Sequence, residues 1–183
     1  QNSKLNGIPV IIGGGDRGVV ASCSYEARYF GVRSAMPIRM ALKLCPEAKV
    51  IKGDHEQYSK LSNEVTEIIQ EKVPLVEKAS IDEFYLDLTG MDRFFGCYQW
   101  TTEVAESIKK NTGLPISFAV SANKTVAKIG TGEAKPLGRI EIPNREIQPF
   151  LNPLSIKKIP MVGNVTFQLL SRIGIRQIKT LAE

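Results

Sequence analysis

Two adjacent acids, Asp82 and Glu83, lie between two runs of residues that are typical of β-strands. The apolar run at 73–79 (VPLVEKA) precedes them, and residues 84–89 alternate apolar with polar side chains, a period of two that predicts a half-buried strand. Successive side chains of a regular strand point to opposite faces, so the two acids could not serve one site inside a strand. At the tip of a hairpin they can converge on a hard cation such as Mg²⁺, which prefers oxygen ligands. The pattern therefore predicts an acidic hairpin, with a solvated Asp-Glu turn as the alternative.

Composition narrows the class of protein. The 183 residues are 43% hydrophobic and 23% charged, which is typical of a globular chain with one large or two small domains. No apolar run approaches the roughly 20 residues of a membrane span, so we expect no membrane partner. An odd number of cysteines without metal-ligand spacing predicts a reduced, cytoplasmic protein. His55 is the only histidine, which argues against Ser-His or Cys-His catalysis, and the net charge of +5 permits a polyanionic partner.

The order of predicted elements gives the fold class. Strands predicted near residues 10–12, 19–24, 49–51, 116–121 and 139–142 alternate with helices, and the acidic hairpin lies between them. The helices are predicted at residues 25–31, 37–44, 58–69, 97–108 and 124–129, with Asn123 capping the last of them. This order predicts an α+β fold, with helices on one face of a sheet.

A short helix after the second strand carries a candidate nucleotide site. Ser22 or Ser24 can cap this helix and Gly31 can end it. Tyr25 and Arg28 are three residues apart and so share a helical face. An aromatic ring beside a guanidinium group near a helix N-terminus would suit a nucleoside triphosphate. A helix face packed on the sheet is the alternative, and the spacing alone does not decide between them.

The character of the chain changes at Pro143. Prolines punctuate a linker, and a helical segment is predicted to begin within residues 156–166 and to end at Gly174, with Leu169, Leu170 and Ile173 as its apolar stripe. Two short helices around a glycine-containing turn are similar to a helix-hairpin-helix, which offers backbone N–H groups to DNA phosphates. The basic residues that flank this turn are Lys157, Lys158, Arg172, Arg176 and Lys179. A small helical bundle is the alternative.

Together these segments resemble the Y-family translesion DNA polymerases. Residues 25–37 (YEARYFGVRSAMP) resemble the fingers motif, and residues 80–87 (SIDEFYLD) resemble the palm motif with two of the three metal-binding acids. Residues 120–128 (VSANKTVAK) and 134–136 (AKP) resemble a later palm motif. The resemblance implies a ferredoxin-like palm that is incomplete, small α/β fingers, and an all-α helix-hairpin-helix thumb. The implied domains are fingers at 1–54, palm at 55–143 and thumb at 144–183.

The resemblance also implies the roles of particular residues. Asp82 would be a shared metal ligand, and Glu83 would be the catalytic acid that binds or orients the metal at the primer terminus. The incoming deoxynucleoside triphosphate would be held by Tyr25, Arg28 and Lys135, with Ser22 near them. The floor under the nascent base pair would be Val32 and Ala35. Primer-template DNA would be contacted by Lys157, Lys158, Gly163 and Asn164, and the implied cofactor is Mg²⁺ in a two-metal site.

The sequence departs from this family at several points. The first palm strand is not present, and with it go the third metal-binding carboxylate and the aromatic residue that rejects ribonucleotides. Met161 replaces the first glycine of the usual Gly-hydrophobic-Gly turn of the thumb, and Phe84 stands where alanine is common. Gln1 is not an initiator, and residues 178–183 end within an apparent helix, so we expect a fragment. Because the third carboxylate is missing, we expect this fragment to bind metal poorly and to polymerise nothing. Contacts with a sliding clamp would depend on a C-terminal segment outside this sequence.

Two other readings remain open at this point. Nucleotidyl cyclases of the diguanylate type carry a Gly-Gly-Asp-Glu-Phe hairpin, and residues 82–84 match its last three positions. Ser80 and Ile81 in place of the two glycines count against that reading, as does the basic helical tail. The third reading is a non-catalytic DNA-binding module, against which the retention of both acids argues.

Overall fold

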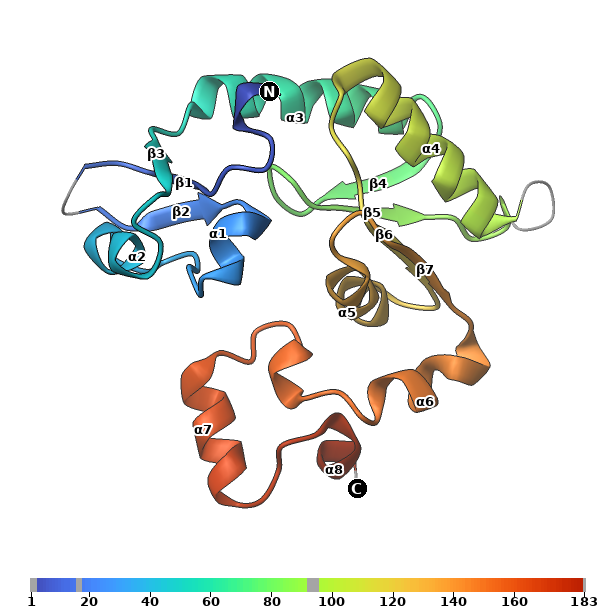
Figure 1. Ribbon diagram of the computed structural model, residues 1–183. Coiled ribbons are helices and arrows are strands. Elements are labelled where there is room, and N and C mark those ends of the chain that lie inside the picture. Colours follow the sequence, from blue (N-terminus) through green and yellow to red (C-terminus); the bar gives the residue numbers. More distant parts are fainter. Residues whose placement is uncertain (1–2, 16–17, 92–95, 183) are drawn as a thin grey trace. The chain divides into compact units, whose positions relative to one another are not determined.

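The computed structural model describes residues 3–15, 18–91 and 96–182 of the chain (Figure 1). Contacts divide the chain into two compact units, residues 1–58 and 59–183. Among the described residues, no helix is both long enough and apolar enough to cross a membrane. The division into fingers at 1–54, palm at 55–143 and thumb at 144–183 stays a prediction.

The first unit is a three-stranded sheet with two short helices. After the 3₁₀ turn η1 (Ser3–Leu5), β1 (Val10–Gly13) runs antiparallel to β2 (Val20–Cys23) and parallel to β3 (Lys49–Ile51). The helices α1 (Tyr25–Tyr29) and α2 (Ile38–Leu44) complete it. Its core contains nine buried residues: Ile11, Val20, Cys23, Ala27, Val32, Ile38, Ala41, Cys45 and Ala48. These elements lie where the sequence predicted strands and helices.

Local chemistry explains both ends of α1. The Ser24 hydroxyl accepts a hydrogen bond from Ala27 N at 3.3 Å, which satisfies one of the free N–H groups at the helix start. The same hydroxyl accepts a second hydrogen bond from Val10 N at 3.0 Å, so the cap also ties α1 to the sheet. Two residues after the helix, Gly31 has a φ of +89°, a conformation that favours glycine. Of the two predicted caps, Ser24 is therefore the one observed.

The second unit contains the predicted acidic hairpin. The helix α3 (His55–Gln70) leads into β4 (Leu75–Lys78), which pairs antiparallel with β5 (Phe84–Asp87), and α4 (Cys97–Thr112) follows. In this unit the apolar sides of α3 and α4 form a core with the inner side of the hairpin. The buried members are Val65, Ile69, Val73, Val104 and Ile108, and Phe84, Leu86 and Trp100 pack against them partly buried. The hairpin is thus held from one side, as the alternation predicted.

The helix α5 (Lys124–Ala134) joins two parallel strands, β6 (Phe118–Ser121) and β7 (Arg139–Ile142). The predicted end of this helix at Ile129 was wrong, because α5 continues through two glycines to Ala134. A Cβ atom added to Gly130 would lie 2.6 Å from Ile142 Cδ1 and 2.8 Å from the Ala119 Cβ. Glycine therefore allows a close approach of helix to sheet, and this packing outweighs its poor helix propensity.

Within the described part of the chain the strands form three small sheets, in the orders β2-β1-β3, β4-β5 and β6-β7, where the sequence predicted one sheet. The mixed α+β class is nevertheless confirmed.

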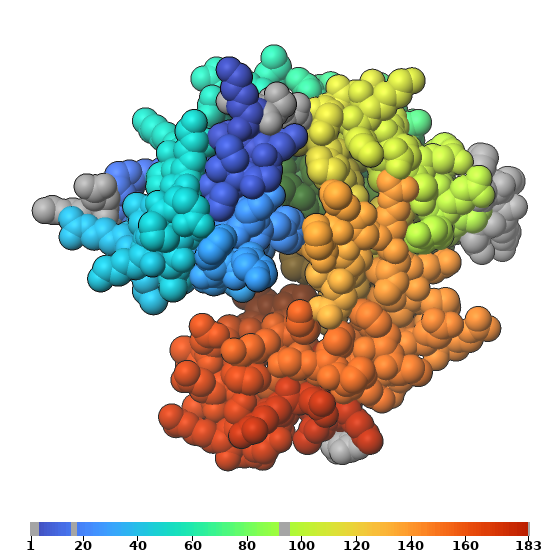
Figure 2. All heavy atoms as spheres, viewed as in Figure 1, coloured from blue at the N-terminus to red at the C-terminus, as the bar shows by residue number. Residues whose placement is uncertain are grey.

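Short helical elements make up the end of the chain. They are η3 (Asn144–Glu146), α6 (Ile147–Leu151), η4 (Ile156–Lys158), α7 (Asn164–Arg172) and α8 (Ile178–Ala182). The sequence predicted helix from within 156–166, and the α-helix itself begins at Asn164 after a separate 3₁₀ turn. Of the predicted apolar stripe, Leu169 and Ile173 are 57% and 71% exposed, and Leu170 is half-buried, so two of its three residues face solvent. These elements are the orange and red atoms of Figure 2.

Candidate active site

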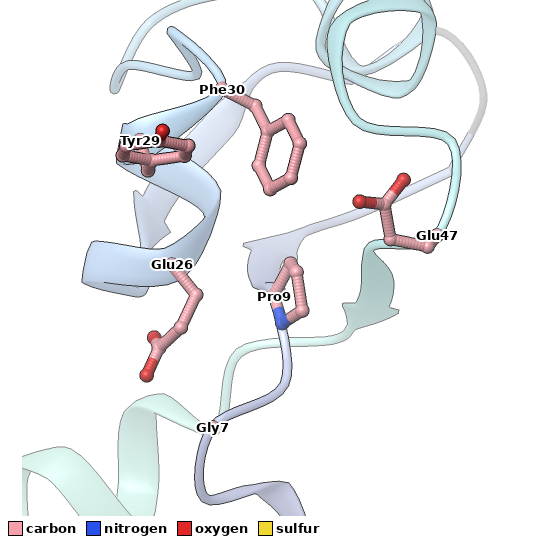
Figure 3. Close-up of a pocket in the computed structure, with 6 residues that line it drawn as sticks. All are labelled: Gly7, Pro9, Glu26, Tyr29, Phe30 and Glu47. Atoms are coloured by element: carbon pink, nitrogen blue, oxygen red, sulfur yellow. The ribbon is translucent and has the colours of Figure 1, made fainter.

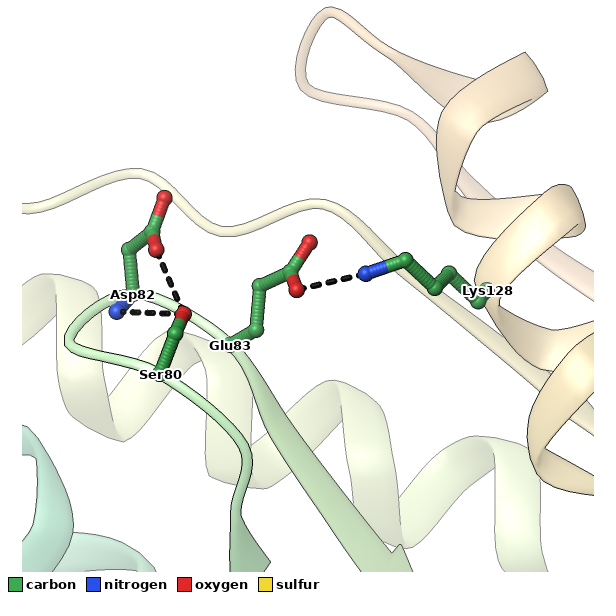
Figure 4. Close-up of polar contacts among 4 residues, drawn as sticks. All are labelled: Ser80, Asp82, Glu83 and Lys128. Atoms are coloured by element: carbon green, nitrogen blue, oxygen red, sulfur yellow. Dashed lines mark hydrogen bonds and ion pairs between the residues drawn. The ribbon is translucent and has the colours of Figure 1, made fainter. Parts of the chain in front are cut away.

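The turn between β4 and β5 holds Asp82 and Glu83 in a defined conformation (Figure 4). The backbone N–H groups of Ala79 and Ser80 both donate to the Glu83 carbonyl oxygen, at 3.0 and 3.2 Å. The Ser80 hydroxyl donates to Asp82 Oδ1 at 2.8 Å and accepts from Asp82 N at 3.4 Å. One serine therefore fixes both the backbone and the carboxylate of Asp82.

Glu83 has a partner on another element. Lys128 of α5 donates from Nζ to Glu83 Oε2 at 2.5 Å, and both side chains are partly exposed. The hydrogen bond to Glu83 raises the pKa of Lys128, and the charges of Glu83, Tyr85 and Asp82 raise it further against the cost of desolvation. Both carboxylates therefore lie within electrostatic reach of one ammonium group. Figure 4 shows them projecting from the same side of the turn.

A second lysine of α5 pairs with the same hairpin. Lys124, one helical turn before Lys128, forms an ion pair with Glu77 of β4, and its Nζ lies 5.5 Å from the centre of the Tyr85 ring. Glu77 and Tyr85 are opposite each other in the β4-β5 register. The start of α5 is fixed by Asn123, whose side-chain oxygen accepts from Val126 N at 3.0 Å. Two lysines on a capped helix thus face two glutamates of the hairpin.

Asp87 lies at the other end of β5, opposite Leu75. Its carboxylate accepts hydrogen bonds from Thr89 Oγ1 at 2.6 Å and Thr89 N at 2.9 Å. The hydrogen bond from the Thr89 hydroxyl lowers the pKa of Asp87 most. The hydrogen bond from Thr89 N and the charge of Lys124 lower this pKa further. Asp87 therefore stabilises the chain locally, through Thr89, at the end of β5 away from the acidic turn.

The donor set of the acidic turn fits a magnesium ion. Among residues 3–15, 18–91 and 96–182, no group of three or more His, Cys, Asp or Glu residues could hold a metal ion. Mg²⁺ is, however, usually bound by one or two carboxylates together with substrate phosphates and water. The contacts of Asp82 and Glu83 engage Oδ1 and Oε2, one oxygen of each carboxylate. This pair of hard carboxylates, Asp82 exposed and Glu83 partly exposed, can therefore supply two ligands of such a site, with the remaining ligands supplied from elsewhere.

The predicted nucleotide-binding residues of the first unit lie on β2 and α1. Tyr25 is 51% exposed, and the Arg28 guanidinium carbon lies 5.4 Å from the centre of its ring, so the predicted shared face is confirmed. Arg28 Nε donates to the Cys23 carbonyl oxygen at 3.3 Å, which leaves its two terminal nitrogens for other acceptors. Ser22 is exposed on β2. Their role in binding a triphosphate stays a prediction.

A cavity of about 420 Å³ lies on the first unit beside these residues (Figure 3). Its lining consists of Gly7, Pro9, Glu26, Tyr29, Phe30 and Glu47. None of the predicted nucleotide-binding residues is among them, and two carboxylates would repel phosphate. The cavity is therefore a poor candidate for the triphosphate site.

The two residues predicted to form the floor under the base pair differ in environment. Val32 is 0% exposed and belongs to the core of the first unit, so in this structure it offers no surface to a base. Ala35 is exposed and has a φ of +66°, and its N–H donates to the Val20 carbonyl oxygen at 2.8 Å. Only Ala35 has the accessible surface that the prediction requires.

The predicted DNA-binding lysines have partners within the chain. Lys158 forms an ion pair of 2.6 Å with Glu133 of α5, and the Lys157 ammonium group lies 4.2 Å from the centre of the Phe167 ring. Lys135, predicted to bind triphosphate, is exposed just after α5. Gly163 and Asn164 are exposed at the start of α7.

The turn before α7 contains a residue in a left-handed backbone conformation. Met161 has a φ of +69° and is 99% exposed. This left-handed conformation favours glycine, the residue that Met161 replaces in the predicted turn.

Sequence reasoning gave no role to Ser80 or Lys128, although both stand in the motifs that it used. The contact between Lys128 and Glu83 joins residues 45 apart in the chain, so no local pattern reveals it. The spacing of Lys124 and Lys128, which places both on one helical face, was the signal available.

Solved structures define the class of the fold. The chain aligns over 100% of its length with the crystal structure of DinB from Sulfolobus solfataricus, with a TM-score of 0.90 and 31% identity over 55% of that chain. The insertion ternary complex of Dbh DNA polymerase gives the same TM-score, identity and coverage. The mixed α+β fold is thus the fold of these polymerase structures.

Sequence relatives and a family model give the particular family. DNA polymerase IV of Alkaliphilus oremlandii is 41% identical over 186 residues, and that of Exiguobacterium sibiricum is 41% identical over 182 residues. These alignments cover 100% and 98% of this chain but 47% and 51% of the relatives, so the chain spans about half of their length. The model of the impB/mucB/samB family matches residues 1–132. The chain therefore belongs to the impB/mucB/samB family, and the predicted Y-family resemblance is confirmed.

Proposed function

We propose that the protein to which this chain belongs is a template-directed DNA polymerase of the translesion type. It adds deoxynucleotides to a primer 3′ end by two-metal nucleotidyl transfer and copies past damaged bases. The observation that carries this proposal is the pair of carboxylates on the β4-β5 turn, in a chain of this family. The relatives named DNA polymerase IV and the ternary complex of Dbh DNA polymerase support it. Family membership also favours this function over a diguanylate-type cyclase.

In the proposed reaction, Asp82 and Glu83 would be the two carboxylates of this chain that hold Mg²⁺. Bound divalent cations supply charge that stabilises the attacking and leaving oxygens of an in-line displacement. The turn contributes fixed carboxylate positions, since Ser80 holds Asp82 and Lys128 holds Glu83. Positions fixed before the substrate arrives need no reorganisation during the reaction.

Residues with exposed cationic or aromatic groups would bind the triphosphate. Arg28 and Lys135 would offset the charge on its phosphates, Tyr25 would lie against it, and Ser22 would be near. The two terminal guanidinium nitrogens of Arg28 are suited to bidentate contact, because Nε alone is engaged by the Cys23 carbonyl. Ala35 would lie under the nascent base pair, whereas Val32 is completely buried in the core of the first unit.

The segment 144–183 would grip primer-template DNA as a helix-hairpin-helix thumb, following fingers at 1–54 and a palm at 55–143. Backbone groups at Gly163 and Asn164 would meet phosphate at the start of α7, which has nine residues. Lys157 would add a positive charge, and Lys158 would exchange Glu133 for a phosphate. The odd number of cysteines, without metal-ligand spacing, supports a reduced, cytoplasmic setting. Clamp contact would require residues outside this sequence.

The 183-residue chain by itself would be inactive, because the proposed site needs a further carboxylate. The test is primer extension with Mg²⁺ and four deoxynucleotides. We expect no product from the 183-residue chain, and template-directed product once the segments of the Alkaliphilus relative outside the aligned region are joined to it. A joined, folded protein that binds primer-template DNA without extending it would favour the DNA-binding module. Conversion of GTP to a cyclic dinucleotide would favour the cyclase.

A further inference from the structure

Lys128 is the cation nearest to the acidic turn among the contacts of the described residues, and α5 holds it in place. The helix is capped by Asn123 at its start, and Gly130 packs directly against β6 and β7. Lys128 lies between these two anchors. Its ammonium group is therefore carried by an element that the fold positions independently of the hairpin.

The contact of Lys128 resembles what a metal ion would make at the same place. Its ammonium group binds Glu83 Oε2 at 2.5 Å, and the charge of Asp82 also acts on it. Two adjacent carboxylates repel each other, and a fixed positive charge relieves this repulsion. The same charge opposes the approach of a second cation to the pair.

We propose that Lys128 is a positioning residue that serves as the resident cation of the acid pair. It orients Glu83 and neutralises the turn before metal binds, and it competes with the incoming divalent cation for the Glu83 carboxylate. This inference rests on the proposed function, since it takes Asp82 and Glu83 as metal ligands. It goes beyond that function by naming Lys128 as a residue that lowers the affinity of the site for metal.

Lys124 provides a matched control for this role. It lies on the same helix four residues earlier, it too pairs with a glutamate of the hairpin, and it too is partly exposed. Its partner is Glu77 of β4, which is not a predicted metal ligand. A general effect of removing one lysine from α5 should appear in both variants, whereas competition with metal should appear only at Lys128.

The experiment measures binding of Mn²⁺ by the electron paramagnetic resonance signal of the free ion, on the 183-residue chain. We expect Lys128→Met to lower the Kd for Mn²⁺ about fivefold, and Lys128→Arg and Lys124→Met to change it less than about twofold. Circular dichroism and thermal unfolding without metal establish that each variant is folded. A larger rise of Tm on adding Mn²⁺ in Lys128→Met than in the wild type is the second expected result.

Three outcomes distinguish a failure of the proposed role of Lys128 from a failure of the proposed metal site at Asp82 and Glu83. Tighter Mn²⁺ binding in Lys128→Met alone supports the resident cation. Unchanged or weaker binding in that variant overturns it, while the metal site itself stands if Asp82→Asn abolishes the binding of the wild type. Mn²⁺ binding that Asp82→Asn leaves intact overturns the proposed metal site and the inference with it.

Discussion

The acidic turn of the second unit and the cationic face of α1 in the first unit are stabilised in different ways. Glu83 is held by Lys128, 45 residues away on another element. Arg28 is held by the Cys23 carbonyl five residues before it and lies against Tyr25 on its own helix. The position of Glu83 thus depends on how α5 packs, whereas Arg28 is held by residues within five positions of it along the chain. Substitutions that alter the packing of α5 should therefore affect Glu83, whereas the position of Arg28 should be affected only by substitutions near it in the chain.

The largest expected effect is at the acid pair. In the joined, active polymerase described above, Glu83→Gln keeps the shape of the side chain and removes the charge that a cation requires. Because metal assistance contributes several kcal/mol, we expect the rate of primer extension to fall about 100-fold or more. Glu77→Gln, which removes the partner of Lys124, should reduce the rate less than about threefold. Equal losses in the two variants would assign both glutamates to structure.

A smaller effect is expected at the cationic face. Arg28→Ala should raise the KM for deoxynucleotide about 10- to 100-fold, since a hydrogen bond to a charged group is worth about 1.5–3 kcal/mol. Binding of primer-template DNA should change little. Arg39→Ala, at an exposed position of α2 in the same unit, is the control and should leave KM unchanged. Steady-state kinetics with one varied nucleotide measures both, and an unchanged KM in Arg28→Ala would contradict the predicted role.

The packing of α5 on β6 and β7, on which the position of Lys128 depends, can be tested through the two glycines of α5. Gly130→Ala places a Cβ atom 2.6 Å from Ile142 Cδ1, and we expect a loss of about 1–3 kcal/mol in the free energy of unfolding. Gly132→Ala meets nothing within 4 Å on the same helix, and should stabilise the chain by about 0.5–1 kcal/mol. Urea denaturation followed by circular dichroism compares the two. Equal stability of the two variants would mean that α5 does not pack closely on β6 and β7.

The same contrast explains what could be predicted from the sequence. The cap at Ser24, the shared face of Tyr25 and Arg28, and the β4-β5 hairpin follow from residues close together in the chain, and the structure confirms them. Local reasoning ended α5 too early, because the packing that makes Gly130 favourable comes from β6 and β7. It also could not find that Val32 is completely buried.

Side-chain contacts between residues far apart in the chain could not be predicted from the sequence either. The motifs indicated which acids matter, but the contact of Lys128 with Glu83 depends on how α5 lies against the hairpin. The pairing of Lys158 with Glu133 is of the same kind, since it joins η4 to α5. In each case the residue types were visible in the sequence and the partner was not.

The most direct test of the account is to locate a bound paramagnetic ion. Mn²⁺ added in substoichiometric amounts to the ¹⁵N-labelled chain should broaden the backbone amide resonances of residues 79–85 first, followed by those of α5 around Lys128. Asp82→Asn combined with Glu83→Gln should remove this pattern while the remaining resonances stay in place. Broadening that instead centres on Glu26 and Glu47, or that survives the double substitution, would contradict the claim that the β4-β5 turn is the metal site.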